Sequence, residues 1–241
     1  MAAAGAAAGG DRRRPRPRPA GDVSLALFYG GTFDPVHAGH LAVARAARGV
    51  FGTDLAFVPA ADPPHRAAPG ASAAQRAQML ALAIAGEPGF RVDPRELLRS
   101  GPSYTVGTLR ELRAERGPDA PLAWVLGADA FRGLPDWHAW QALMDLAHFV
   151  VAVRPGHALD ALPPALQAAC TGRWHADPAD LAAAPAGRLY RLDMALHPAS
   201  ATQIRRALAA DAGREAWLDP AVAAYIDREG LYRGGPGPAG V

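Results

Sequence analysis

The apolar positions of the chain fall into short runs, separated by longer segments in which apolar residues recur with a helical period. Runs that are apolar throughout are typical of parallel strands covered on both faces. The pattern therefore predicts an α/β fold, a doubly wound parallel sheet. Six runs are expected to form its strands: residues 25–29, 55–59, 90–92, 122–127, 148–154 and 188–194.

The segments between these runs are predicted to be helices. Ser72, Ser103 and Ser200 are expected N-caps, and Gly117 an expected helix end. Residues 156–187 are rich in Ala, Pro and Gly and show no clear pattern. The expected helices cover residues 39–51, a segment beginning after Ser72, 103–117, 137–147, 200–213 and 220–230.

Both ends of the chain differ in composition from the rest. Residues 1–22 contain the run "RRRPRPRP" and are predicted to be a disordered leader. Residues 23–233 are expected to form one domain, with a small helical part at about 196–233, and residues 234–241 a disordered tail. The rest of the chain is nearly neutral, so the basic character belongs to the leader.

Composition excludes several classes of protein. The longest apolar runs are too short to cross a bilayer, so no membrane association is expected. The single cysteine, Cys170, excludes an internal disulfide and a multi-cysteine zinc site, and it favours a cytoplasmic location. Because the chain has no lysine, it can carry neither a Walker A motif nor a Schiff-base lysine.

The segment "GGTFDPVHAGH", residues 30–40, follows the first predicted strand. Ligands of doubly wound sheets bind at such carboxyl ends of strands. Gly30 and Gly31 are expected to permit a tight turn and close approach of a ligand, and His37 and His40 to share one face of a helix start. Free N–H groups and the helix dipole favour phosphate at that position.

Two other interpretations of the histidine pair are weaker. Two unrelated surface histidines would not explain the glycine between them or the strand and Gly-Gly turn before them. A metal pair lacks a third ligand at a supporting distance in the sequence. A second helix start, "SATQIR", offers the hydroxyls of Ser200 and Thr202 and the guanidinium of Arg205 to another anion.

Together these motifs resemble the nucleotidyltransferases that carry an HxGH element, and in particular the bacterial nicotinate-nucleotide adenylyltransferases. "SATQIR" is similar to the family motif ISSTxIR, and the segments "PPHR" (63–66), "PSYT" (102–105), "GAD" (127–129), "LPDWH" (134–138) and "RPG" (154–156) follow the family order. The resemblance covers about residues 24–233. It implies a Rossmann-like fold and a reaction in which nicotinate mononucleotide attacks the α-phosphorus of ATP, with Mg²⁺ carried by ATP and no metal ligand from protein side chains.

The resemblance also implies roles for single residues. His37, His40 and Arg205 are the expected catalytic residues. ATP is expected to contact Gly30, Gly31, Thr32, Phe33, His37, His40, Gly127, Asp129, Ser200, Thr202 and Arg205. Nicotinate mononucleotide is expected to contact His65, Arg66, Tyr104, Thr105, Trp137 and Arg154.

Three further positions bear on these expectations. Asp34 is expected to cap local N–H groups. Ala199 and His138 depart from the usual Ile and Tyr of the family, and His138 leaves the selectivity between the acid and the amide mononucleotide open.

Two alternative functions stay open at the level of sequence. Another phosphorylated acceptor, such as phosphopantetheine, or cytidylyl transfer would use the same superfamily motifs. A non-catalytic nucleotide-binding or RNA-binding protein would use the leader, but the leader has no aromatic residue for stacking on bases, so nucleic acid is not an expected partner. Whether the chain forms a homo-oligomer is likewise open.

Overall fold

The computed structural model describes residues 24–61, 70–153, 159, 162–195, 197–210 and 217–233. The predicted leader and tail lie outside these residues, and so do His65, Arg66 and Arg154 of the predicted site.

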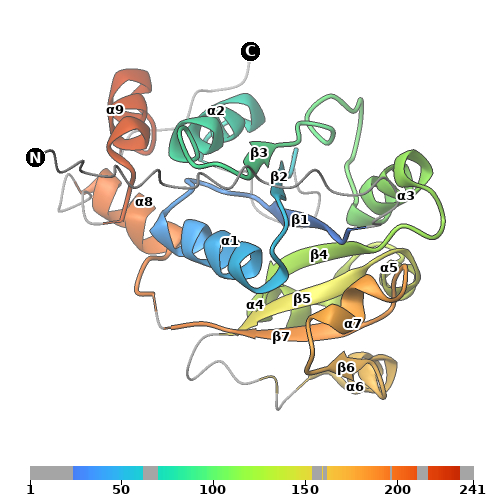
Figure 1. The fold of residues 1–241 in the computed structure, drawn as a ribbon. Coiled ribbons are helices and arrows are strands. Elements are labelled where there is room, and N and C mark those ends of the chain that lie inside the picture. The colour runs from blue at the N-terminus through green and yellow to red at the C-terminus, as the bar shows by residue number, and fades with distance from the viewer. Residues whose placement is uncertain are drawn as a thin grey trace, which may run out of the picture.

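The described part of the chain forms one seven-stranded sheet in the order β3-β2-β1-β4-β5-β7-β6 (Figure 1). Every neighbouring pair of strands is parallel. All six predicted strands are present with small shifts at their ends, which confirms the predicted α/β class. The strands are β1 (Ala26–Gly31), β2 (Leu55–Pro59), β3 (Phe90–Val92), β4 (Leu122–Gly127), β5 (His148–Val153), β6 (Trp174–His175) and β7 (Leu189–Asp193).

Helices follow most of the strands. Those described are α1 (Ala38–Phe51), α2 (Ala73–Ala83), α3 (Thr105–Arg116), α4 (Ala128–Arg132), α5 (Leu143–Leu146), α6 (Pro164–Cys170), α7 (Ala179–Ala182), α8 (Ala201–Ala209) and α9 (Pro220–Glu229), with 3₁₀ turns η1 (Leu134–Asp136) and η2 (Trp140–Ala142). Ser72 caps α2 as predicted, in a capping box with Gln75.

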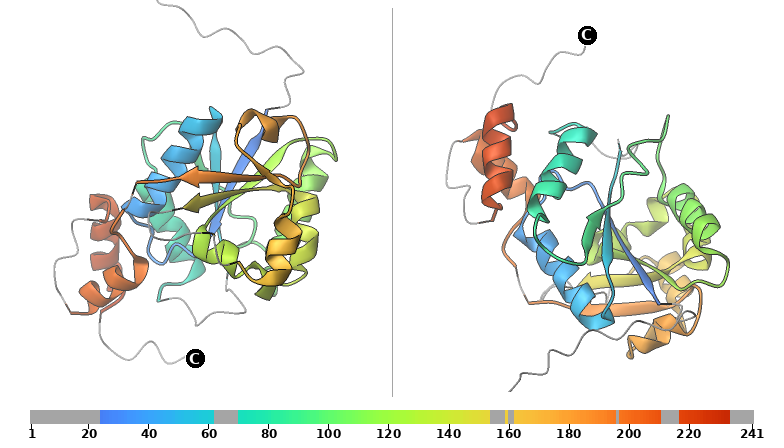
Figure 2. Two further views of the ribbon diagram at one scale, coloured as in Figure 1. Left: turned by 90° about the horizontal axis from the view of Figure 1, so that it is seen from below. Right: turned by 45° about the horizontal axis from the view of Figure 1, so that its top comes forward.

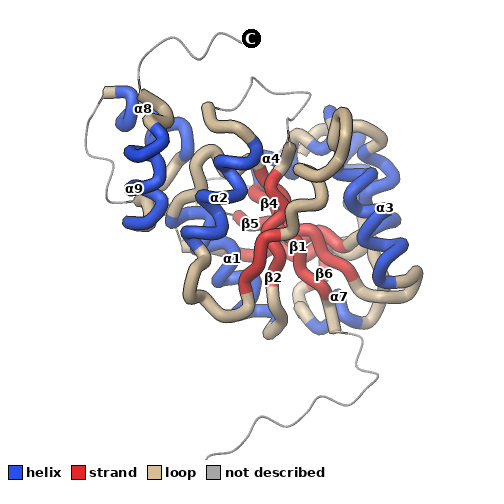
Figure 3. Tube along the Cα trace, turned by 90° about the horizontal axis from the view of Figure 1, so that it is seen from above, coloured by secondary structure: helices blue, strands red, loops and turns tan. Residues whose placement is uncertain are grey.

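Alternate residues of the central strands contribute to two hydrophobic clusters on opposite faces of the sheet. Leu27 and Val125 pack with α1, α2, α8 and α9 on one face. Phe28 and Trp124 pack with α3, α4, α5 and α6 on the other. Figure 3 shows the strands between α1 and α2 on one side and α3 on the other. This division explains why β1, β2 and β4 are apolar throughout, because helices cover both of their faces.

The strand order reverses between β1 and β4, which are hydrogen-bonded neighbours. Their carboxyl ends, Gly31 and Gly127, therefore lie side by side at the switch point of the sheet. Helices α8 and α9, from the end of the chain, lie on the same side as α1 and α2 (Figure 2). The C-terminal helices are thereby brought next to the turn that follows β1.

Two local expectations are wrong, and a stretch with no clear pattern contains regular structure. The segment 137–147 is not one helix, because Trp137 is extended and Ala139 is left-handed, and only η2 and α5 form within it. Helix α3 begins after Tyr104 and not after Ser103, whose side chain instead accepts a hydrogen bond from Arg99. The unpatterned stretch 156–187 contains α6, α7 and the edge strand β6. Among the described residues no helix is long and apolar enough to cross a membrane.

Candidate active site

A cavity of about 780 Å³ opens at the carboxyl ends of β1 and β4. Its volume is typical of a small-molecule site, and it lies at the predicted switch point. Every predicted site residue that the structure describes lines this cavity. These residues are Gly30, Gly31, Thr32, Phe33, His37, His40, Tyr104, Thr105, Gly127, Asp129, Trp137, Ser200, Thr202 and Arg205.

His37 forms the N-cap of α1. Its Nδ1 accepts a hydrogen bond of 3.1 Å from the backbone N–H of Gly39. An Nδ1 that accepts cannot carry a proton, so the ring proton of His37 sits on Nε2. Its imidazole is stacked on that of His40, with ring centres 3.8 Å apart and an angle of 26° between the planes. The pair is thus fixed as a block, in which His37 is a neutral donor through its Nε2–H.

Gly30 and Gly31 line the cavity, but they do not make the tight turn expected there. Neither has a positive φ, and the tight turn after β1 uses Phe33, whose φ is 52°. A Cβ on Gly30 would lie 2.0 Å from Cζ2 of Trp124, and one on Gly31 would lie 2.9 Å from Cζ of Phe33. The space beside these glycines is filled by aromatic rings of the protein, which form the floor of the cavity.

Asp34 is buried, and it joins segments that are far apart in the sequence. Its carboxylate accepts hydrogen bonds from the backbone N–H groups of Gly70 (2.8 Å) and Ala71 (3.2 Å). It also accepts one of 2.6 Å from the Tyr232 hydroxyl. Burial and this carboxylate raise the pKa of Tyr232. The expected role as a local cap is therefore wrong, since the partners lie after β2 and after α9.

Arg205 of α8 is held by the same residue. Its Nη1 donates to the carbonyl oxygen of Asp34 at 2.6 Å and lies 3.8 Å from the Asp34 carboxylate, and its Nη2 donates to Thr202 Oγ1 at 3.4 Å. The neighbouring Arg206 is exposed and does not line the cavity. Ser200 is the N-cap of α8 but makes no side-chain cap bond to it. The two predicted anion-binding segments thus meet in one pocket, joined through Asp34.

The opposite wall carries the aromatic residues. Tyr104 forms the N-cap of α3 without a side-chain cap bond, and its ring lies 4.4 Å from that of His138. Trp137 is half-buried and packs against the same cluster as Trp124. An aromatic surface therefore lies beside a helix start, an arrangement suited to a flat ring that carries a carboxylate.

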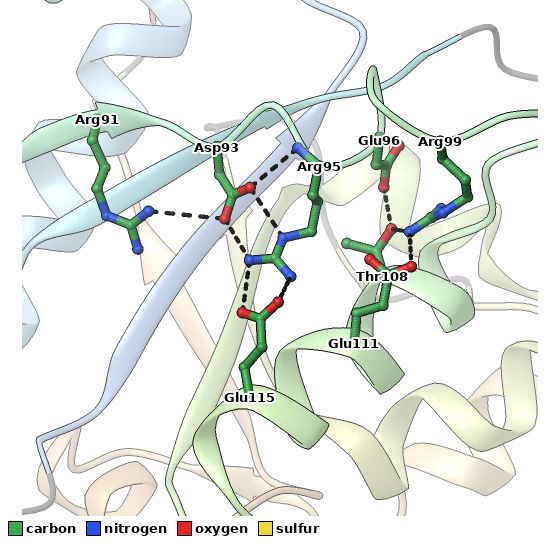
Figure 4. Close-up of polar contacts among 8 residues, drawn as sticks. All are labelled: Arg91, Asp93, Arg95, Glu96, Arg99, Thr108, Glu111 and Glu115. Atoms are coloured by element: carbon green, nitrogen blue, oxygen red, sulfur yellow. Dashed lines mark hydrogen bonds and ion pairs between the residues drawn. The ribbon is translucent and has the colours of Figure 1, made fainter.

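The start of α3 is anchored by a polar network that the sequence did not reveal (Figure 4). Thr108 donates to Glu96 at 2.6 Å, and Arg99 donates to Thr108 at 3.3 Å and to Glu111 at 2.8 Å. Glu96 lines the cavity and is 5% exposed. Burial raises the pKa of its carboxyl, while the bond from Thr108 acts in the opposite direction.

Arg76 is another residue that sequence reasoning missed. Its side chain is completely buried in α2, and its guanidinium donates to the backbone carbonyls of Thr32 (2.7 Å), Ala71 (3.3 Å) and Ala61. It ties the turn after β1 to the loop before α2. Nothing in the helical pattern of α2 distinguishes this inward-pointing arginine from a solvent-facing one.

Gly127 ends β4, and Asp129 follows in the first turn of α4. The Asp129 carboxylate is largely exposed and lies 3.5 Å from Arg132. Among the described residues there is no group of three or more His, Cys, Asp or Glu side chains that could hold a metal ion.

Comparison with known proteins places the chain in a family. The cytidylyltransferase-like family model matches residues 28–207. A probable nicotinate-nucleotide adenylyltransferase from Stenotrophomonas maltophilia is 54% identical over 217 residues, which are 88% of this chain and 98% of that protein. The chain belongs to the nicotinate-nucleotide adenylyltransferase family. The family and the enzyme class expected from the sequence are thereby confirmed.

Other members of the family show the same relationship. A probable nicotinate-nucleotide adenylyltransferase from Cronobacter sakazakii is 46% identical over 87% of this chain and 96% of its own. The Plasmodium falciparum nicotinic acid mononucleotide adenylyltransferase complexed with NaAD has a TM-score of 0.64 at 16% identity, covering 87% of this chain and 97% of that one. The same enzyme complexed with APC has a TM-score of 0.60. These structures confirm the Rossmann-like fold.

Proposed function

We propose that this adenylyltransferase family member transfers the adenylyl group of ATP to nicotinate mononucleotide. The products are nicotinate adenine dinucleotide, a precursor of NAD, and pyrophosphate. The observation that carries the proposal is the convergence of the His37–His40 block and the Ser200–Arg205 helix start on one pocket whose other wall is aromatic. The names of the relatives, at up to 54% identity, support the choice of substrates.

The reaction needs positioning more than acid–base chemistry. A phosphate monoester has a second pKa of about 6 and is largely a dianion at neutral pH. One of its oxygens attacks the α-phosphorus of ATP, the bond from that phosphorus to the bridging oxygen breaks, and pyrophosphate leaves with the electron pair. The protein has to hold two anions in line and stabilise the charge that develops.

We assign these tasks to the two walls of the cavity. The Nε2–H of His37 and the imidazole stacked on it face the triphosphate, and Arg205 and the start of α8 hold its far end. Asp129 accepts from the ribose hydroxyls of ATP. On the other wall, Trp137 stacks on the pyridine ring, and the N–H groups at Thr105 receive its carboxylate.

We propose that Mg²⁺ enters with ATP. Two of the carboxylates that line the described cavity are bound by protein donors, Asp34 by Gly70, Ala71 and Tyr232, and Glu96 by Thr108. The pocket thus fits an ion held by triphosphate oxygens and water, which Mg²⁺ usually retains. When bound, the ion would neutralise charge on the triphosphate.

The decisive experiment is a pyrophosphate-release assay on the full chain with ATP or CTP and a panel of acceptors. Nicotinate mononucleotide with ATP should be the preferred pair, compared with nicotinamide mononucleotide and phosphopantetheine. Preference for another acceptor, or for CTP, would contradict the proposal. A variant lacking residues 1–22 should keep full activity, whereas a binding protein that works through its leader would lose its function.

In the same assay, His40→Ala should lower turnover by about 10²–10³-fold, the usual cost of removing one group that stabilises developing charge. The fold should be retained, as measured by circular dichroism. His175→Ala is the matched control, because His175 lies on β6 and does not line the cavity. Near-normal turnover of His40→Ala would remove His40 from catalysis.

A further inference from the structure

Four histidines line the cavity, His37, His40, His138 and His197, and only His197 lies outside the motifs. His197 lies between β7 and α8, three residues before Ser200, and it is half-buried. It contributes to the same wall as Ser200, Thr202 and Arg205.

The hydrogen bonding of His197 repeats that of His37. Its Nδ1 accepts from the backbone N–H of Ala199, two residues on, at 3.1 Å. In His37 the Nδ1 accepts from Gly39, also two residues on and also at 3.1 Å. In both, the accepting Nδ1 places the ring proton on Nε2. Two helices that enter the cavity are thus each preceded by an imidazole fixed as an N–H donor.

The two segments also touch each other. A Cβ on Gly39 would lie 3.4 Å from the carbonyl oxygen of Ala199 and 3.0 Å from the His37 ring. The glycine between His37 and His40 therefore allows the segment after β7 to pack against the start of α1. His197 is carried on that segment, two residues before Ala199, and lines the same cavity as the stacked pair.

The chemistry of this wall favours an anion over a metal ion. Nδ1 of His37 and Nδ1 of His197 are both occupied by backbone N–H groups, and the described residues contain no cluster of three metal ligands. Donors dominate the wall: the imidazole N–H groups, the Arg205 guanidinium and the start of α8. The Asp34 carboxylate beside this wall already accepts hydrogen bonds from three protein donors.

We propose that His197 is a further ATP-binding residue, whose Nε2–H donates a hydrogen bond to the triphosphate. The inference rests on the proposed function in its choice of ATP. The mononucleotide is the less suitable partner, because Tyr104 and Trp137 pack with the cluster on the opposite face of the sheet. His197 would thus complete a set of three imidazoles around one polyphosphate.

The test separates the donor from the backbone cap. His197→Asn keeps an acceptor that can receive the Ala199 N–H, as asparagine does in turns, but it lacks an N–H at the Nε2 position. His197→Ala loses both. Binding of ATP, of inorganic tripolyphosphate and of nicotinate mononucleotide to the full chain is measured by titration calorimetry, together with the melting temperature of each variant.

In His197→Asn, Kd for ATP and for tripolyphosphate should rise about tenfold, and Kd for nicotinate mononucleotide should stay unchanged. His175→Asn is the matched control. Its ring bonds to Asp180 at 2.8 Å, outside the cavity, and binding of all three ligands should be unaffected.

Three results would overturn the inference. Unchanged affinities in His197→Asn, with a loss only in His197→Ala, would make the residue a backbone cap. A loss for ATP without one for tripolyphosphate would place the ring against adenosine. Equal losses for the mononucleotide would indicate a general change in the pocket. The assay uses no acceptor reaction, so failure of the wild type to adenylylate nicotinate mononucleotide would refute the proposed function and leave this result standing.

Discussion

A methyl group added to Gly30 tests how the floor of the cavity is built. In Gly30→Ala the new Cβ would lie 2.0 Å from Cζ2 of Trp124, 2.6 Å from Cε2 and 3.0 Å from Cη2. The indole is 2% exposed and wedged in the core, so it is not the flexible end of a side chain that could swing away. Either the ring or strand β1 has to move.

Forcing extra volume into a packed core costs about 1–3 kcal/mol. For a domain of this length, 1 kcal/mol corresponds to about 2–4 °C in melting temperature, so Gly30→Ala should lower it by about 2–12 °C. Gly49→Ala is the control, because Gly49 is exposed in the last turn of α1 with nothing within 4 Å of a Cβ. It should be neutral or stabilising by about 0.5–1 kcal/mol, since alanine is the better helix former.

The assay is urea denaturation of wild type, Gly30→Ala, Trp124→Phe and the double variant. Phenylalanine lacks the outer carbons that come nearest to the new methyl group, so the double variant should be hardly less stable than Trp124→Phe alone. The coupling free energy should be at least about 1 kcal/mol. Additive losses would refute the reasoning. So would a Gly30→Ala variant of normal stability that binds ATP poorly, because the glycine would then serve ligand approach.

Two further predictions follow from the hydrogen bonds. Tyr232→Phe removes the 2.6 Å hydrogen bond to Asp34, the residue that holds Arg205. KM for ATP should rise several-fold, with little change in KM for the mononucleotide. Tyr225→Phe on α9 should change neither KM, and an equal effect of the two variants would contradict the link between Tyr232 and Arg205. His148 is buried with its Nε2 2.8 Å from the Ala184 carbonyl and its Nδ1 accepting from Arg188, and burial lowers its pKa below the ordinary 6.5. As the pH falls, His148 therefore takes up a proton in the unfolded chain at a higher pH than in the folded one. The free energy of unfolding should fall as the pH drops below about 6.5. A His148→Gln variant whose free energy of unfolding depends on pH between about 5 and 8 as steeply as that of the wild type would refute this.

The sheet could be predicted because burial on both faces leaves a direct mark in the sequence. β2, β3 and β4 begin and end where their apolar runs do. The two-residue strand β6 has no periodicity to detect, and it forms only because β7 offers an open edge to pair with. The helix predicted over residues 137–147 is wrong for the opposite reason. Its apolar spacing fits a helix, but the left-handed Ala139 interrupts it, and that conformation has no signature in an alanine.

The candidate site likewise contains residues that could be predicted from the sequence and residues that could not. Residues in contiguous motifs, such as His37 and Ser200, could be predicted because the chemistry of a helix start is local. Asp34 was assigned the wrong partners because its hydrogen bonds reach Gly70, Ala71 and Tyr232, which only folding brings near. His197 lies outside every motif, and only its place on the cavity wall singles it out. Glu96 and Arg76 leave no comparable signal, since their roles depend on burial.

The construction of the pocket bears on how the reaction can turn over. In the described residues, the guanidinium of Arg205 is already engaged by Asp34, and His37 is fixed as a neutral donor. Neutral N–H donors attract phosphate less strongly than a cluster of unpaired arginines would, because they carry no net positive charge. Pyrophosphate is itself a polyanion that has to leave, and equally tight binding of reactant and product phosphates would not speed the chemical step. Donors that are aligned but uncharged can be specific for the geometry of the transferring phosphate without retaining the product.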